Sequence, residues 1–172
     1  ITSMDKKKVD YSLYAITDRR FISIPLEEAV EQAILGGVTI VQLREKEIST
    51  LEYIDLAVKV KKMTEKYGIP LVINDRVDVV LASGADGVHL GEDDMPVSLA
   101  RTILGPEKII GASFPDIPRA CAACEAGADY LGVGAVFGTS SKLDAGDAIG
   151  VEVLKEMKRR LPVPIVGVGG IN

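Results

Sequence analysis

Short apolar runs recur along the chain and set its predicted secondary structure. The runs are almost continuously apolar and do not alternate with polar residues, which is typical of strands that helices cover on both faces. Seven strands are predicted in this way: Leu13–Thr17, Ile40–Leu43, Leu71–Ile73, Gly87–Leu90, Ile109–Ala112, Tyr130–Gly134 and Ile165–Val168.

The segments between these runs have helical spacing. Pro25 suits the first turn of one helix, and Gly68 with Pro70 ends the next. Gly37, Gly84 and Gly127 each follow a helical segment and lead into a buried strand, as expected of glycines that cap helices in the left-handed conformation. A chain of strand–helix units forms either a doubly wound sheet or a (β/α)8 barrel.

Polar clusters decide between these two folds. The first strand–helix turn lacks a G-x-G-x-x-G fingerprint, which disfavours a dinucleotide-binding sheet. Nearly every strand is followed by polar residues, and in a barrel these would meet on one face. We therefore predict an α/β (β/α)8 TIM barrel in one domain, residues 1–172, with residues 1–10 as a flexible N-terminal extension. Only seven strands are visible, so the last strand and helices are missing from this sequence.

Composition narrows the possible partners. The net charge is −5 and the pI is about 5.0, which disfavours nucleic acid and anionic membranes as partners. No apolar run approaches the roughly 20 residues that span a bilayer. The first residues lack a signal peptide's apolar stretch, and a cytoplasmic protein is expected.

Two residue types that often carry chemistry are assigned to the core. Cys121 and Cys124 form a lone C-x-x-C at helical spacing among alanines, so we expect two small buried thiols. A redox or metal role is the alternative. His89, the single histidine, lies inside a predicted strand and is expected to be a buried, hydrogen-bonded core residue.

Cations and carboxylates follow the next strands. Arg44 and Lys46 are two residues apart after the second strand, so both could reach one phosphate. Alternatively they form a solvated charge cluster with Glu45 and Glu47. Asp75 and Asp94 follow the third and fourth strands, and two carboxylates with substrate phosphates are a common Mg²⁺ site. Helix capping is the alternative for these carboxylates.

A hydroxyl-rich loop, Thr139-Ser140-Ser141-Lys142, follows the sixth strand. Its hydroxyls, backbone amides and ammonium could hold a phosphate, although it could also be an ordinary polar connection. Gly169 and Gly170 end the seventh strand, where barrels often bind phosphate.

Together these clusters resemble the thiamin-phosphate synthase family, including its thiazole tautomerase-like relatives. The matching stretches run in family order from residue 14 to the last residue. They are Tyr14-Ala15-Ile16-Thr17-Asp18, Gln42-Leu43-Arg44-Glu45-Lys46, Asn74-Asp75-Arg76, Gly87-Val88-His89-Leu90-Gly91 with Asp94, Gly111-Ala112-Ser113, Thr139–Lys142 and Gly169-Gly170-Ile171.

The resemblance implies an Mg²⁺-dependent transferase that is usually a homodimer. It would join hydroxymethylpyrimidine diphosphate to a thiazole phosphate and release pyrophosphate. By the same resemblance, Asp75 and Asp94 would hold Mg²⁺, and Ser113 would lie against the leaving pyrophosphate. The pyrimidine diphosphate would be bound by Gln42, Arg44, Lys46, Asn74 and Lys142, and the thiazole phosphate by Thr139, Ser141 and Gly170. Arg44, Lys46, Ser113 and Lys142 are the residues expected to act in catalysis.

Two rival functions stay open. Tautomerase-like relatives place a histidine after the sixth strand, where this chain has Ala135, and tend to lose the diphosphate and metal residues that this chain keeps. The other rival is a non-catalytic phosphate-ligand-binding barrel. The missing last strand favours it, whereas the retained site residues argue against it, namely Arg44, Lys46, Asp75, Asp94 and Lys142.

Overall fold

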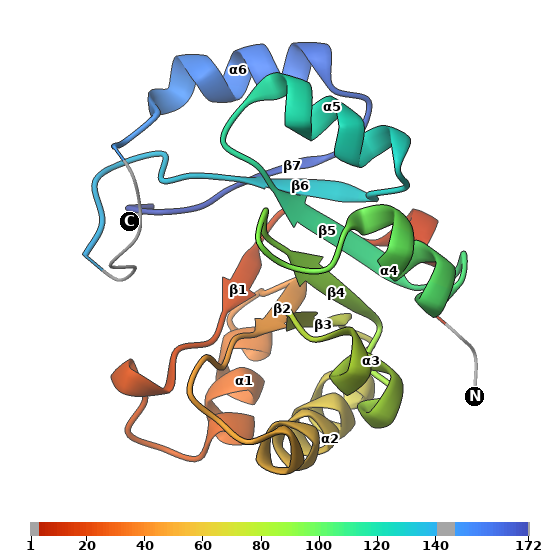
Figure 1. The fold of residues 1–172 in the computed structure, drawn as a ribbon. Coiled ribbons are helices and arrows are strands. Elements are labelled where there is room, and N and C mark those ends of the chain that lie inside the picture. Colours follow the sequence, from red (N-terminus) through yellow and green to blue (C-terminus); the bar gives the residue numbers. More distant parts are fainter. Residues whose placement is uncertain (1–3, 141–146, 172) are drawn as a thin grey trace.

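The seven predicted strands form one parallel sheet in sequence order (Figure 1). This computed structural model describes residues 4–140 and 147–171. Each predicted strand is present, with ends that shift by at most two residues. The strands are β1 (Tyr14–Ile16), β2 (Ile40–Leu43), β3 (Leu71–Asn74), β4 (Gly87–Leu90), β5 (Ile109–Ser113), β6 (Tyr130–Val133) and β7 (Ile165–Gly167).

The sheet curves into a nearly closed barrel. Every strand pairs in parallel with the next one along the chain, from β1 with β2 to β6 with β7. Within residues 4–140 and 147–171, no ladder joins β1 to β7, so these two strands are the edges of the sheet. The (β/α) barrel architecture predicted from the sequence is confirmed for these seven strands.

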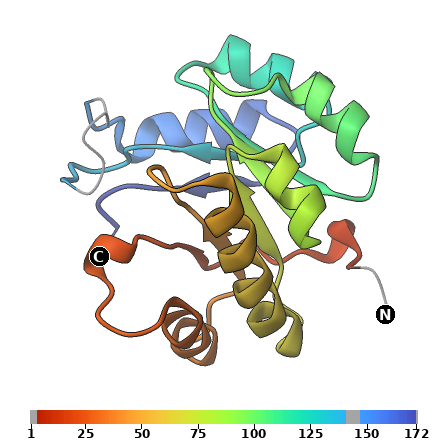
Figure 2. The same cartoon turned by 60° about the horizontal axis from the view of Figure 1, so that its bottom comes forward.

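Helices lie outside the curved sheet (Figures 1 and 2). Local sequence explains where several begin: Ser49 and Glu52 form a capping box at the start of α2, and Asp116 caps α5. Pro25, expected inside the first turn, instead occupies the position before α1. The helices are α1 (Leu26–Leu35), α2 (Thr50–Lys66), α3 (Val77–Ser83), α4 (Val97–Leu104), α5 (Ile117–Glu125) and α6 (Gly150–Arg160), with short 3-10 helices η1 (Lys6–Lys8) and η2 (Arg19–Phe21).

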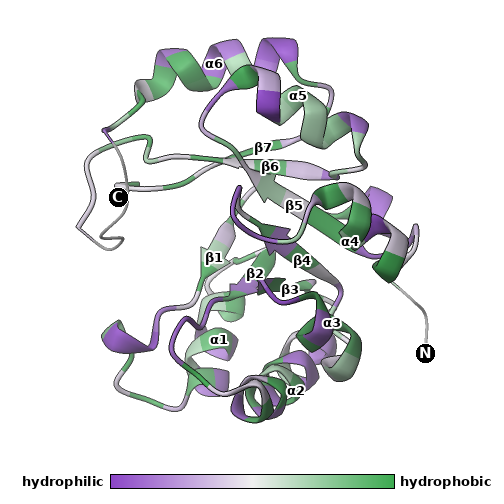
Figure 3. Cartoon of the chain, in the orientation of Figure 1, coloured by the Kyte–Doolittle hydropathy of each residue, from purple (hydrophilic) through white to green (hydrophobic). Residues whose placement is uncertain are grey.

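The main hydrophobic core lies between the strands and the inner faces of the helices. All residues of β2, β3 and β6 are buried, as the continuous apolar runs predicted. Figure 3 shows the matching pattern on α6, where hydrophobic and hydrophilic positions alternate around the helix. Met157 is the buried residue of that helix. Strands covered in this way can present side chains only at their ends and toward the barrel interior.

A second, smaller cluster lies inside the barrel. Ile109, Tyr130 and Val166 are buried there, and Met4 and Val9 pack against them. Lys6 pairs with Asp129 at 2.9 Å. Residues 4–10, part of the segment expected to be a flexible extension, therefore make defined contacts with the barrel.

The two cysteines lie on α5, as the helical spacing predicted. Both are free thiols that pack against the core, but they are half-buried and not fully enclosed. Burial raises the pKa of the Cys124 thiol. Among the described residues there is no cluster of three potential metal ligands, so the structure gives no support for a metal role of this C-x-x-C.

None of the described helices is long and apolar enough to cross a membrane.

Candidate active site

Contacts between side chains and backbone connect the carboxyl ends of five neighbouring strands. The amide of Arg44, after β2, donates to the Thr17 hydroxyl after β1 (3.0 Å). The amide of Asp75, after β3, donates to the His89 carbonyl of β4 (2.9 Å). His89 Nε2 in turn lies 2.7 Å from Ser113 Oγ at the end of β5. Residues separated by almost a hundred positions in sequence therefore form one face, as the barrel prediction requires.

The two candidate metal ligands lie beside each other on this face. Asp75 takes a left-handed backbone conformation (φ 66°) and accepts a hydrogen bond from Lys46. Asp94 Oδ2 accepts from the amide of Gly91 (2.7 Å). Burial raises the pKa of the Asp94 carboxyl, and the neighbouring Asp75 raises it further. Two carboxylates this close favour a cation between them.

This donor set fits Mg²⁺. The described residues provide two carboxylates here and no third acidic, histidine or cysteine ligand. Mg²⁺ commonly uses one or two carboxylates and completes its octahedron with phosphate oxygens and water. The capping alternative is wrong for both residues, because Arg76 and Pro96 precede α3 and α4 and neither helix has a side-chain cap.

The cations beside the carboxylates differ in their pairing. Lys46 is paired with Asp75, whereas the Arg44 guanidinium makes no hydrogen bond or ion pair within residues 4–140 and 147–171. The pKa of Asp18 is lowered mainly by its hydrogen bond from Arg20, and the charge of Arg44 adds to this. Glu45, expected to pair with Arg44 and Lys46 in the alternative interpretation, instead accepts from Arg19 (2.8 Å). Arg44 is thus available to an anion.

Two buried amides face the same region. Gln42 is 3% exposed, and its Nε2 donates to the Tyr14 hydroxyl (2.8 Å). Asn74 is 6% exposed, and its Nδ2 is a buried donor without a partner in the described residues. An unsatisfied buried donor is costly, by about 1–3 kcal/mol, unless a ligand, an ion or a water accepts from it. A ligand acceptor at Asn74 would remove this cost.

His89 differs from the core residue that we predicted. It is hydrogen-bonded, as expected, but only half-buried, and it contacts the candidate site through Ser113. Its Nδ1 lies 2.8 Å from the hydroxyl of Tyr130. Sequence reasoning did not identify Tyr130 as a functional residue, and the one signal available was an aromatic residue in a strand of small and aliphatic ones.

The loop after β6 lies against the end of β7. The amide of Phe137 donates to the Gly169 carbonyl (3.0 Å). Gly170 has φ 67°, and a Cβ there would come within 2.7 Å of the Gly138 carbonyl oxygen. Gly170 therefore lies beside the loop that leads to Thr139. Ser141 and Lys142, two further predicted site residues, lie outside the described residues.

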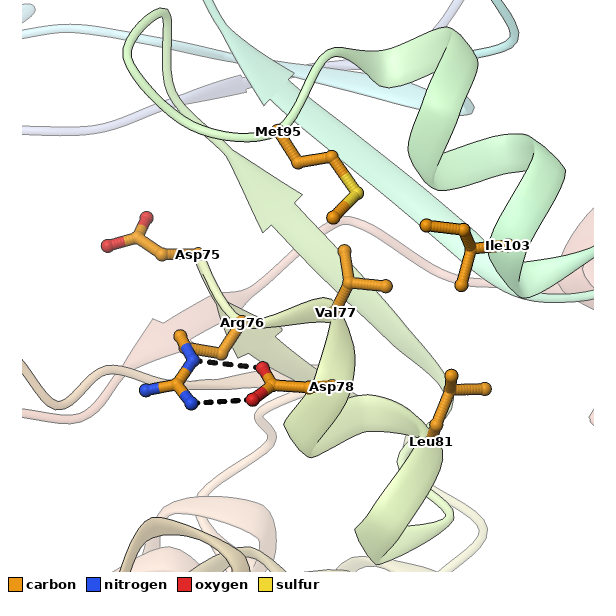
Figure 4. Close-up of a pocket in the computed structure, with 7 residues that line it drawn as sticks. All are labelled: Asp75, Arg76, Val77, Asp78, Leu81, Met95 and Ile103. Atoms are coloured by element: carbon orange, nitrogen blue, oxygen red, sulfur yellow. Dashed lines mark hydrogen bonds and ion pairs between the residues drawn. The ribbon is translucent and has the colours of Figure 1, made fainter. Parts of the chain in front are cut away.

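A cavity of about 330 Å³ opens between α3 and α4, outside the barrel (Figure 4). Val77, Leu81, Met95 and Ile103 give it a mainly apolar lining, and Arg76 pairs with Asp78 at its edge. In Figure 4, Asp75 points away from the apolar side chains. Asp75 thus borders both this cavity and the polar face at the strand ends, but its carboxylate lies on the side of the polar face.

Comparisons with known proteins identify relatives of this chain. The sequence profile of the thiamine monophosphate synthase family matches residues 13–172. The chain is 54% identical to the thiamine-phosphate synthase of Clostridium acetobutylicum, covering 96% of this chain and 79% of the relative. For the enzyme of that name from Ruminiclostridium cellulolyticum, the identity is 51%, with coverage of 97% and 80%.

Solved structures give the same result. Thiamine phosphate pyrophosphorylase from Pyrococcus furiosus superposes with a TM-score of 0.85 at 41% identity, over 97% of this chain and 78% of that one. An N-acetylmannosamine-6-phosphate 2-epimerase from Clostridium perfringens has a TM-score of 0.69 at 14% identity and shares the fold alone. On the profile match, the two relatives at about 50% identity and the Pyrococcus structure, the chain belongs to the thiamine monophosphate synthase family.

Proposed function

We propose that this chain is an Mg²⁺-dependent transferase that makes thiamin phosphate. It would join the methylene carbon of hydroxymethylpyrimidine diphosphate to the ring nitrogen of a thiazole phosphate and release pyrophosphate. The observation that carries the proposal is the set of groups at the ends of β2, β3 and β4: a guanidinium and a buried amide without partners among the described residues, and two adjacent carboxylates. Family membership supplies the reaction.

The protein groups suit a step in which a diphosphate departs. Departure leaves positive charge on the pyrimidine methylene and negative charge on the leaving oxygens, so the site must neutralise an anion and needs no strong base. Arg44 would bind the diphosphate, and Lys46 would join it after release from Asp75. Asp75 and Asp94 would hold Mg²⁺, which would neutralise the leaving group when bound. Lys142 is assigned to the same anion by resemblance.

The organic parts of the substrates would be held by neutral groups. Asn74 and Gln42 are amides that can hydrogen-bond the pyrimidine ring, and both are buried, so the ring would be shielded from water. Shielding matters because water would otherwise compete with the thiazole for the electrophilic carbon. Thr139, Ser141 and Gly170 would contact the thiazole phosphate, and the position of Gly170 against Phe137 and Gly138 supports this assignment.

One assay separates the proposed function from its rivals. The protein is incubated with Mg²⁺, hydroxymethylpyrimidine diphosphate and thiazole phosphate, and thiamin phosphate is measured by mass spectrometry. We expect product that disappears with EDTA and in Arg44→Ala. Isomerisation of a thiazole carboxylate phosphate without thiamin phosphate would favour the tautomerase-like alternative, which Ala135 at the end of β6 disfavours. Binding of both substrates without any turnover would favour the non-catalytic barrel.

A further inference from the structure

A chain of hydrogen bonds crosses the barrel interior and joins two of the site residues. It starts at Gln42 Nε2 on β2, which lies 2.8 Å from the Tyr14 hydroxyl on β1. The Tyr14 and Tyr130 hydroxyls are 2.5 Å apart. The chain then passes from Tyr130 through His89 to Ser113 at the end of β5. It contains five side chains from five different strands.

The donors and acceptors among these groups determine the direction of the hydrogen-bond chain. The amide nitrogen of Gln42 can only donate, so the Tyr14 oxygen accepts from it. Within the described residues, the acceptor in reach of the Tyr14 proton is then the Tyr130 oxygen. Tyr130 must in turn donate its own proton to His89 Nδ1. A neutral imidazole that accepts at Nδ1 carries its proton on Nε2, and this N–H faces Ser113 Oγ.

We propose that Tyr130, together with Tyr14, is a positioning residue that holds the His89 ring with its Nε2–H toward Ser113. Ser113 then accepts from His89 and keeps its own hydroxyl proton free to donate to an anionic ligand. This inference rests on the proposed function in one respect: the anion is the departing diphosphate. If the hydrogen bonds ran in the opposite direction, Ser113 would donate its hydroxyl proton to His89 and could offer only lone pairs to that anion.

Two independent features support this assignment. The barrel makes room for the chain with glycines: a Cβ at Gly111 would lie 2.1 Å from the Tyr130 ring, and one at Gly132 would lie 2.7 Å from Ser113 Oγ. Both phenols also keep their protons at neutral pH, since burial raises the pKa of Tyr14 to about 12 and that of Tyr130 well above its usual value. Both tyrosines can therefore donate.

The first test reads the tautomer directly and needs no ligand or turnover. His89 is the only histidine of the 172-residue sequence, so its imidazole nitrogens give unambiguous signals in ¹⁵N NMR of the full chain. At about pH 8, above the ordinary histidine pKa, we expect a neutral ring protonated at Nε2. Tyr130→Phe should convert this into a mixture of tautomers. A wild-type ring protonated at Nδ1, or an unchanged spectrum in Tyr130→Phe, would overturn the proposal.

Tyr11→Phe is the matched control. The Tyr11 ring contacts the Tyr130 ring, with centroids 4.9 Å apart, but its hydroxyl takes no part in the hydrogen-bond chain. The same atom is removed from the same aromatic cluster, so Tyr11→Phe should leave the His89 signals unchanged. A change equal to that of Tyr130→Phe would assign the effect to packing and would also overturn the proposal.

The second test is a double-mutant cycle on the rate of a single turnover. Tyr130→Phe should slow product formation about threefold to tenfold, the range of one neutral hydrogen bond. In a Ser113→Ala background it should have no further effect, because its influence passes through Ser113. Independent, multiplying effects would overturn the positioning role. If the wild-type protein makes no thiamin phosphate, the proposed function fails, and the NMR result still decides the direction of the chain.

Discussion

The ammonium group of Lys46 donates a hydrogen bond to Oδ2 of Asp75 across the ends of β2 and β3. One candidate phosphate ligand is thus paired with one candidate metal ligand. Binding of Mg²⁺ to Asp75 would release Lys46, and Lys46 could then bind an anion. We therefore expect the pair to link the two binding events.

The first prediction follows from this link: Mg²⁺ and pyrophosphate bind cooperatively. Calorimetric titration with pyrophosphate should show clearly tighter binding with Mg²⁺ than with EDTA. Asp94→Asn should weaken binding only when Mg²⁺ is present, because it removes a metal ligand and leaves the cations in place. Asp93→Asn is the control, since Asp93 is its exposed neighbour. Equal affinity in Mg²⁺ and in EDTA would exclude the metal assignment.

Arg44→Ala tests the guanidinium that has no partner in the described part of the chain. Loss of one preorganised donor to a developing charge typically lowers kcat about a hundredfold to a thousandfold. We expect a loss of this size in single-turnover rates, and a similar one for Lys142→Ala. Arg119→Ala serves as the control, because Arg119 is an exposed arginine paired with Asp116 and Glu92. Turnover by Arg44→Ala at the wild-type rate would remove Arg44 from the catalytic residues.

Asn74→Ala should weaken substrate binding while it leaves the stability of the free protein almost unchanged. The substitution loses some packing but also removes a buried donor that has no partner within residues 4–140 and 147–171, whose cost is about 1–3 kcal/mol. We expect the Tm of the free protein to change little, whereas the rise in Tm with hydroxymethylpyrimidine diphosphate should be much smaller than in the wild type. A large fall in the Tm of the free protein would show that Asn74 has a structural partner.

Asp94 should give the metal-free protein a specific pH dependence. Its pKa is raised in the folded state, mainly by burial and further by Asp75. Above the unfolded-state pKa the native state therefore binds more protons, and this group makes stability fall as pH rises through its folded pKa. Denaturation in EDTA should show this fall as a difference between wild type and Asp94→Asn. A difference that grows in the opposite direction would contradict the raised pKa.

The edges of the sheet predict self-association. Among the described residues β1 and β7 lack a second neighbouring strand, and Leu13 and Ile16 at the β1 edge are exposed. Unpaired edges pair readily with other chains. Light scattering of a polypeptide of these 172 residues should therefore detect dimers or larger species. A monodisperse monomer with a high Tm would contradict this prediction.

Most of the fold could be predicted because its signals are local. Continuous apolar runs locate β2 to β6 to within one residue, and Gly68 and Pro70 mark the C-terminal end of α2. Polar residues directly after these runs predict which side chains reach the site, since parallel strands end on one face. Such signals depend on neighbours in sequence and need no knowledge of tertiary contacts.

The partners of those side chains could not be predicted. Glu45 pairs with Arg19 and not with its sequence neighbours, and Lys46 pairs with Asp75. The role of His89 depends on register: it pairs with Asn74 on one side and Gly111 on the other, which places Ser113 and Tyr130 within its reach. Register between distant strands is a tertiary property that the sequence does not reveal. From the sequence alone, His89 is therefore predicted to be an ordinary core residue.

Gly111 and Gly132 have a consequence for remodelling the barrel interior. Barrel interiors are usually filled by branched aliphatic side chains, but here the bulk of Tyr130 occupies space that β5 leaves vacant. A larger side chain on one strand at this level must therefore be matched by a smaller side chain on the neighbouring strand. Gly111→Ala alone should disrupt packing, whereas combining it with a smaller residue in place of Tyr130 should restore a folded barrel. A smaller residue at position 130 that lacks the hydroxyl would also remove the hydrogen bond between Tyr130 and His89.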